Sequence, residues 1–164
     1  MSIEAVKRLK VTAASRVIPT KFTPANFAAK EMERVNDFQA RADYARARIP
    51  GQLKLIKAVA SMLAQYEAAP VVYEDSAGYP WKPAWSMSGT EAEARAVIGG
   101  LGKLGFKFLN NQIDYALQKQ TPVRGDYLKM EGVSIFVKFF SKKNTVVVFF
   151  SINNNAPGQG PARL

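Results

Sequence analysis

The stretch from Val133 to Ile152, VSIFVKFFSKKNTVVVFFSI, decides the fold of this chain. Apolar and aromatic side chains predominate in two runs, residues 133–141 and 145–152, and Lys142-Lys143-Asn144 separates them. Runs of β-branched and aromatic residues on both sides of a short polar turn are typical of a β-hairpin. We therefore expect two long antiparallel strands here.

Alternation along the first of these strands sorts its side chains onto two faces. One face holds Val133, Ile135, Val137 and Phe139, and the other holds Ser134, Phe136, Lys138 and Phe140. If the first face is core, Phe136 and Phe140 flank Lys138 on the second face, where they can stack on bases. The second strand is apolar on both faces, which favours a hairpin buried on both sides, by helices or by a second subunit. Both interpretations stay open.

Residues 24–68 upstream of the hairpin have helical periodicity. Thr23-Pro24 is a helix start, because Thr caps well and Pro suits the first helical position. Pro50-Gly51 is a break, so we expect helices over 24–48 and 52–68 that form an antiparallel helical hairpin. The predicted core face of the first helix holds Val35, Phe38, Ala42, Ala45 and Ile49; that of the second holds Leu55, Ile56, Val59, Leu63 and Tyr66.

The middle of the chain supplies the remaining elements. We expect a short strand at 71–73, a loop at 74–87, a strand at 104–109, a helix at 110–120 and a weak strand at 123–130. Thr90 and Glu93 form a capping box that starts a third helix, ending near residue 98.

This order of elements predicts an α+β fold, with an N-terminal helical hairpin and a third helix packed on an antiparallel sheet that ends in the long β-hairpin. We assign residues 1–152 to one domain, with a basic arm at 1–22, and residues 153–164 to a flexible tail.

Composition excludes much of enzyme chemistry. The chain has no Cys and no His, which rules out disulfides, thiol nucleophiles, Ser-His-Asp catalysis and zinc sites of the Cys/His type. Residues 100–105 match the letters G-x-G-x-x-G, but they follow a predicted helix and precede a strand, the reverse of a dinucleotide site. We expect a helix stop there, no cofactor and no enzymatic activity.

Charge points to nucleic acid. The 164 residues include 23 Lys and Arg against 13 Asp and Glu, a net charge of +10 that attracts polyanions. One helix stripe and the hairpin turn gather the cations that we expect to contact phosphates: Lys30, Arg34, Arg41, Arg48, Lys138, Lys142 and Lys143. The aromatic residues predicted to stack on bases are Tyr44, Trp81, Phe136 and Phe140.

These features predict a non-catalytic protein that binds single-stranded DNA or RNA with little sequence specificity, as an accessory factor in replication or transcription. Two alternatives stay open: a virion or assembly protein whose apolar hairpin is a subunit interface, and a regulator that docks on a polymerase through the loop with Trp81 and Trp85. We expect a homodimer or higher oligomer. No apolar run is long enough for a membrane span, and we expect a cytoplasmic protein, in the host cell if it is viral, as the lack of a family signature suggests.

Overall fold

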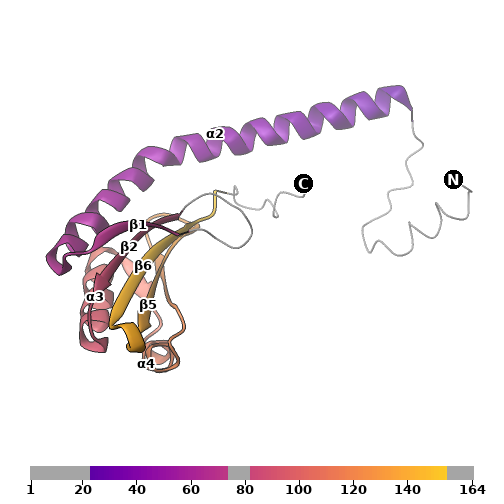
Figure 1. The fold of residues 1–164 in the computed structure, drawn as a ribbon. Helices are drawn as coiled ribbons and strands as arrows, with labels where there is room; N and C mark the ends of the chain where they lie inside the picture. Colours follow the sequence, from indigo (N-terminus) through magenta and orange to yellow (C-terminus); the bar gives the residue numbers. More distant parts are fainter. Residues whose placement is uncertain (1–22, 74–81, 155–164) are drawn as a thin grey trace, which may run out of the picture. The chain divides into compact units, whose positions relative to one another are not determined.

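The computed structural model describes residues 23–73 and 82–154 of the chain. The elements, in chain order, are α2 (Pro24–Leu63), a 3₁₀ turn η1 (Ala64–Tyr66), β1 (Ala69–Tyr73), β2 (Lys82–Ser88), α3 (Glu91–Leu104), β3 (Phe106–Phe108), α4 (Asn110–Lys119), β4 (Val123–Tyr127), β5 (Val133–Phe140), a 3₁₀ turn η2 (Ser141–Lys143) and β6 (Thr145–Ile152) (Figure 1). The predicted α+β class is confirmed.

The strands form one six-stranded sheet in the order β1-β2-β6-β5-β4-β3, and every neighbouring pair is antiparallel. The predicted hairpin is confirmed, with Val133 opposite Ile152 and Phe140 opposite Thr145. The loop that we predicted at 74–87 is wrong from residue 82 onward, because residues 82–88 form β2. This strand pairs with β1 on one side and β6 on the other, so tertiary pairing overrides the turn character of Pro83.

The chain divides into two compact units, the first ending at Gln39 and the second beginning at Ala40. The first unit contributes Thr23 and residues 24–39 of α2 to the described structure, and the second contributes the rest of α2, the sheet, α3 and α4. Each is described by itself below.

The predicted helical hairpin is wrong, because α2 is one helix of 40 residues with Pro50 inside it. Proline removes one backbone hydrogen bond, a loss that tertiary contacts offset here on both sides of Pro50. Before it, Arg48 Nη1 donates to the carbonyl oxygen of Asn153 at 2.9 Å. After it, Gln52 Nε2 donates to Asn154 Oδ1 at 2.7 Å. The helix is thus held to the end of β6 across the proline.

The predicted core face of the first helix is also wrong. Val35 is 55% exposed, Phe38 46% and Ile49 55%. Burial on α2 begins later, where Leu55, Val59 and Leu63 recur every four residues as predicted. On an ideal helix Leu63 lies about 40° around the axis from Ile49, so helical periodicity alone does not explain why Ile49 is exposed. The buried side chains Leu55, Val59 and Leu63 belong to the core that includes the strands.

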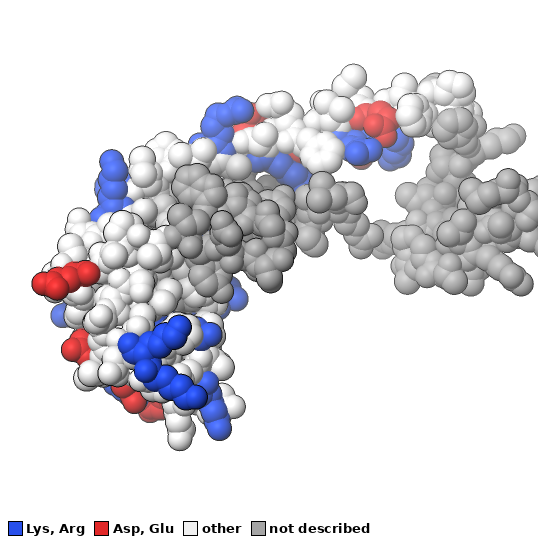
Figure 2. Space-filling view, in the orientation of Figure 1, with Lys and Arg blue, Asp and Glu red and all other residues white. Residues whose placement is uncertain are grey.

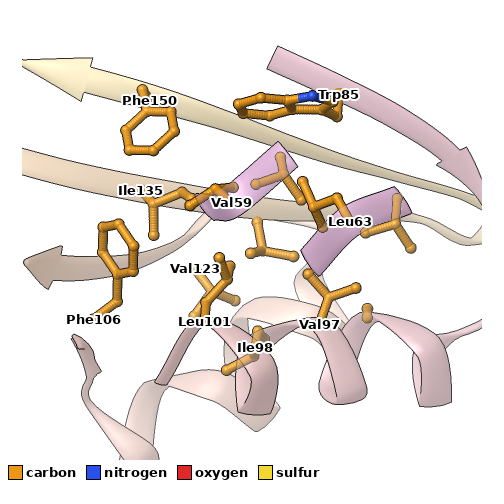
Figure 3. Close-up of a cluster of buried hydrophobic side chains, with 14 of the residues drawn as sticks. Val59, Leu63, Trp85, Val97, Ile98, Leu101, Phe106, Val123, Ile135 and Phe150 are labelled. Carbon is orange, nitrogen blue, oxygen red and sulfur yellow. The ribbon is translucent and has the colours of Figure 1, made fainter. Parts of the chain in front are cut away.

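The core lies between one face of the sheet and the helices. Figure 3 shows Val59 and Leu63 of α2 and Val97 and Leu101 of α3 beside side chains of the strands. Strands alternate, so β5 and β6 send every second side chain into this core: Val133, Ile135, Val137 and Phe139 from β5, and Val146, Val148 and Phe150 from β6.

Helix α3 begins where the sequence predicted but ends later. The capping box is confirmed: the Glu93 carboxylate accepts from the Thr90 backbone N–H at 2.6 Å and from the Thr90 hydroxyl. The predicted end near residue 98 is wrong, because the helix continues through its glycines to Leu104 and is capped by Gly105 at φ +113°. At Gly100 this helix lies close to Met62 of α2, since a Cβ there would lie 3.0 Å from Met62 Sδ.

Candidate nucleic-acid interface

The two faces of β5 differ in what covers them. The four predicted core residues of this strand are buried, whereas Phe136, Lys138 and Phe140 are only partly buried. The alternation read from the sequence is confirmed at these seven positions, whereas Ser134, which it placed on the second face, is buried at 6% exposure. The core packs on the other face, and Phe136, Lys138 and Phe140 keep part of their surface exposed, so we call the face that carries them the open face of the sheet.

Phe136 is held by a stacked aromatic neighbour. It lies directly opposite Phe149 of β6, and the two ring centroids are 5.1 Å apart with an interplanar angle of 10°. Phe149 is buried, at 9% exposure, so Phe136 is the more accessible ring of the pair. A stacked pair across two strands restrains both rotamers, which lowers the entropy cost of presenting Phe136 to a further planar group.

Lys138 and Phe140 form a second local pair on the same face. The Lys138 Nζ lies 4.7 Å from the centroid of the Phe140 ring, within the range of a cation–π interaction. Lys142 and Lys143 follow in η2, where both are exposed. Figure 2 shows Lys and Arg side chains gathered around this end of the sheet. The structure thus brings together five of the predicted site residues: Phe136, Lys138, Phe140, Lys142 and Lys143.

Arg124 of β4 is a neighbour that the sequence analysis missed. It lies opposite Phe136 in the β4–β5 register, on the open face, and is exposed. Its Nε donates to Asp126 Oδ1 at 2.9 Å, and Ser134 Oγ donates to the same oxygen at 2.7 Å. The Ser134 hydrogen bond, followed by Arg124, lowers the pKa of Asp126. Only strand register places Arg124 here, and the weak β4 pattern did not reveal that register.

The predicted cationic stripe on α2 is divided between the two units. In the first unit, Lys30 Nζ pairs with Glu33 at 2.9 Å, and Arg34 Nη1 lies 3.6 Å from Glu31. The Lys30 contact lowers the pKa of Glu33. Arg34 also lies over the Phe38 ring, 5.5 Å from its centroid. These cations already have local anionic neighbours, which weakens their case as phosphate contacts.

In the second unit, the Arg48 guanidinium donates hydrogen bonds to groups of the protein itself. Besides Asn153, it donates to the Glu131 carbonyl oxygen and, at 3.3 Å, to Asn154 Oδ1. Its guanidinium lies over the Tyr44 ring, 5.1 Å from the centroid, so these two predicted contact residues engage each other. Arg41 lies in the same unit and is partly buried. Asn153, which we assigned to the tail, also donates its N–H to the Gly132 carbonyl at 2.7 Å.

Of the two tryptophans in the predicted docking loop, Trp85 belongs to the described residues. Trp81 lies outside the described residues. Trp85 is 7% exposed and meets Phe150 edge-on, with ring centroids 5.9 Å apart. Its indole is therefore part of the core rather than a docking surface.

The described part of the chain has neither a metal-binding cluster nor a membrane-spanning helix. Residues 23–73 and 82–154 contain no cluster of three or more acidic, His or Cys side chains that could hold a metal ion. Within the same ranges, no helix combines the length and apolar character that crossing a lipid bilayer requires.

Comparison of the chain with protein-family models, with curated proteins and with solved structures gave no match.

Proposed function

We propose that this protein binds single-stranded nucleic acid on the open face of its sheet, without catalysis, as an accessory factor in replication or transcription. The observation that carries the proposal is the row of Phe136, Lys138 and Phe140 on β5, partly exposed and backed by a core on the other face. Proteins that hold single strands combine aromatic rings for stacking with cations for the phosphates.

The spacing of the two rings suits an unstacked strand. Phe136 and Phe140 are four residues apart, which along a β-strand is about 13 Å. Lys138 lies midway between them on the same face, where it would contact a phosphate of the strand segment that joins the two stacked bases. A duplex keeps its base faces covered by its own stacking, so these rings favour single strands.

The surrounding charge supports the same ligand. Lys142 and Lys143 continue the line of β5 beyond Phe140. Arg124 lies beside Phe136 but is already paired with Asp126, as Lys30 and Arg34 are with their own carboxylates. If Lys138, Lys142 and Lys143 neutralise about three phosphates, the logarithm of the binding constant falls with the logarithm of salt concentration at a slope near −2.

Fluorescence anisotropy with labelled single-stranded and duplex oligonucleotides, at two salt concentrations, tests the proposal. We expect tight single-strand binding, weaker duplex binding and a steep salt dependence. Phe136→Ala and Phe140→Ala should each weaken binding by about 5- to 150-fold, corresponding to ~1–3 kcal/mol for one stacked base.

A pair of charge-matched variants separates specific contacts from net charge. Lys142→Ala with Lys143→Ala should reduce both the affinity and the salt slope, whereas Lys54→Ala with Lys103→Ala, which removes the same charge from the helices, should have a much smaller effect. Equal losses from both double variants, or unchanged affinity in both Phe variants, would overturn the site assignment.

A further inference from the structure

A groove of about 380 Å³ lies at the edge of the core, in the unit that begins at Ala40. Its apolar lining comes from α2, the end of α3, β4 and the segment after β4, and includes Leu55, Leu104, Tyr127 and Met130. Leu55 belongs to the core and the other three pack against it. This volume is near the lower end for a ligand site, so the groove suits one apolar group.

Two lysines flank this apolar lining. Lys54 comes from α2 and Lys129 from the segment that joins β4 to β5, and both are exposed. Within residues 23–73 and 82–154, neither lysine has an ion pair or a hydrogen bond, and no acidic side chain of those ranges lines the groove. The groove therefore combines an apolar floor with positive charge that the described residues do not compensate.

We propose that this groove binds a peptide segment of another protein, in which a large apolar side chain is flanked by acidic residues. The apolar side chain enters the groove, and carboxylates on its two sides contact Lys54 and Lys129. Charge complementarity selects an acidic segment, because a basic or neutral one would leave both ammonium groups without a counter-charge. The proposal goes beyond nucleic-acid binding and does not depend on it.

The placement of the lysines favours a peptide over a small amphiphilic acid. They come from two different elements, and a chain with an acidic residue on each side of an apolar one supplies a carboxylate to both. A fatty acid carries its single carboxylate at one end. Met130 also suits a peptide anchor, because its unbranched side chain adapts to apolar groups of different shape. It lies against α2, since a Cβ on Gly51 would be 2.8 Å from Met130 Cε.

The same lining is less suited to nucleic acid. Tyr127, the aromatic residue of the described lining, already packs against Phe106, with ring centroids 5.1 Å apart. A Cβ on Gly105 would lie 3.0 Å from Tyr127 Cε2, so the ring is closely packed on this side as well. Stacking on a base requires a free ring face, which the partly exposed Phe136 and Phe140 offer better.

Fluorescence anisotropy with the full chain and a fluorescein-labelled peptide, Gly-Asp-Glu-Phe-Asp-Glu-Gly, tests the proposal. We expect a dissociation constant on the order of 100 μM, because one anchor and two exposed ion pairs supply the binding. Replacing Phe by Ala in the peptide, or its acidic residues by Asn and Gln, should weaken binding at least about tenfold. An acidic Phe peptide that does not bind at about 1 mM, or binds no better than these two, overturns the proposal.

Charge reversal on the protein separates the groove from general attraction to a basic chain. Lys54→Glu with Lys129→Glu should weaken peptide binding at least about tenfold. Lys107→Glu with Lys119→Glu makes the same charge change at exposed lysines that do not line the groove. At about 0.15 M salt, which screens distant charges, this control should change the affinity by less than about threefold. Equal losses in the two double variants overturn the site.

Filling the groove tests the apolar anchor without changing charge. Ala58 lines the groove and is partly buried, so Ala58→Leu places three more carbon atoms there. We expect it to weaken binding of the Phe peptide at least about fivefold while the circular dichroism of the chain stays unchanged. Unchanged affinity in this variant overturns the placement of the anchor, and if the variant unfolds, the lysine variants decide.

Competition distinguishes the other possible occupants. Octanoate that displaces the peptide and has the lower dissociation constant would assign the groove to a small amphiphilic acid and overturn the peptide proposal. A single-stranded oligonucleotide should leave the bound fraction of peptide unchanged, and displacement by it would make the groove part of the nucleic-acid site. Failure of the oligonucleotide to bind at all contradicts only the proposed function, since peptide binding is measured without it.

Discussion

The β5–β6 hairpin and residues 24–39 of α2 are both rich in apolar side chains, but many of those in the hairpin are buried, whereas those in the helical segment are exposed. The hairpin contributes Ile135, Val137 and Val148 to the core, each at 0% exposure. The helical segment leaves Met32, Val35 and Phe38 about half exposed. Periodicity therefore tells which side chains share a face, whereas what covers that face is decided by where other elements pack. Substitutions in the two regions test this difference in burial.

Truncation of a core side chain should separate the two regions most clearly. Ile135→Ala should lower the free energy of unfolding by about 2–5 kcal/mol, because it leaves a cavity under α3. Val35→Ala removes two methyl groups from an exposed position, so in dilute solution its effect should stay within about 0.5 kcal/mol. Urea denaturation followed by circular dichroism measures both changes. Similar losses for the two variants would mean that Val35 is buried in solution.

Glycine substitutions should have opposite signs in the hairpin and on a helix surface. Gly132, which precedes β5, has φ +73°, and a Cβ there would clash with the Asn153 carbonyl oxygen. Gly132→Ala should therefore destabilise the fold by about 1–3 kcal/mol. At Gly99 of α3 a Cβ would meet nothing within 4 Å, so Gly99→Ala should stabilise it by about 0.5–1 kcal/mol. Thermal denaturation compares the pair, and a loss at Gly99 would reveal an unrecognised contact there.

Lowering the pH should slightly lower the free energy of unfolding, through protonation of Asp126. Hydrogen bonds from Ser134 and then Arg124 lower the pKa of this carboxyl, so its contribution to stability is present above the unfolded pKa, near 4. That contribution is lost as the pH falls through the lowered folded value. Asp126 is exposed, so we expect an effect below ~1 kcal/mol. The stability difference between wild type and Asp126→Asn should shrink from pH 6 to pH 3, and a difference independent of pH would contradict this assignment.

Much of the local structure could be predicted from sequence because it depends on neighbours along the chain. The two faces of β5 follow from alternation, and the start of α3 follows from Thr90 and Glu93 at capping-box spacing. Helix α4 occupies the predicted region, and so do β1 and β4. The row of Phe136, Lys138 and Phe140 in the candidate site could be found for the same reason.

The features that the sequence analysis got wrong or missed share a different cause, which is contact between residues far apart in sequence. Pro50 stays helical because Arg48 and Gln52 bond to residues more than 100 positions away. Strand β2 forms between two partner strands although Pro83 within it is typical of a loop. Arg124 joins the open face through strand register alone.

The sequence by itself determined the strand periodicity of the hairpin, the net charge of +10 and the chemistry that a chain without Cys or His lacks, because these depend only on residue type and spacing. Only the tertiary structure decided that α2 is one helix, that Arg48 holds the end of β6, and that the face with Phe136 lies opposite the core. Such outcomes depend on which surfaces meet, since α2 and α3 bury one face of the sheet, whereas Phe136, Lys138 and Phe140 on the other face stay partly exposed.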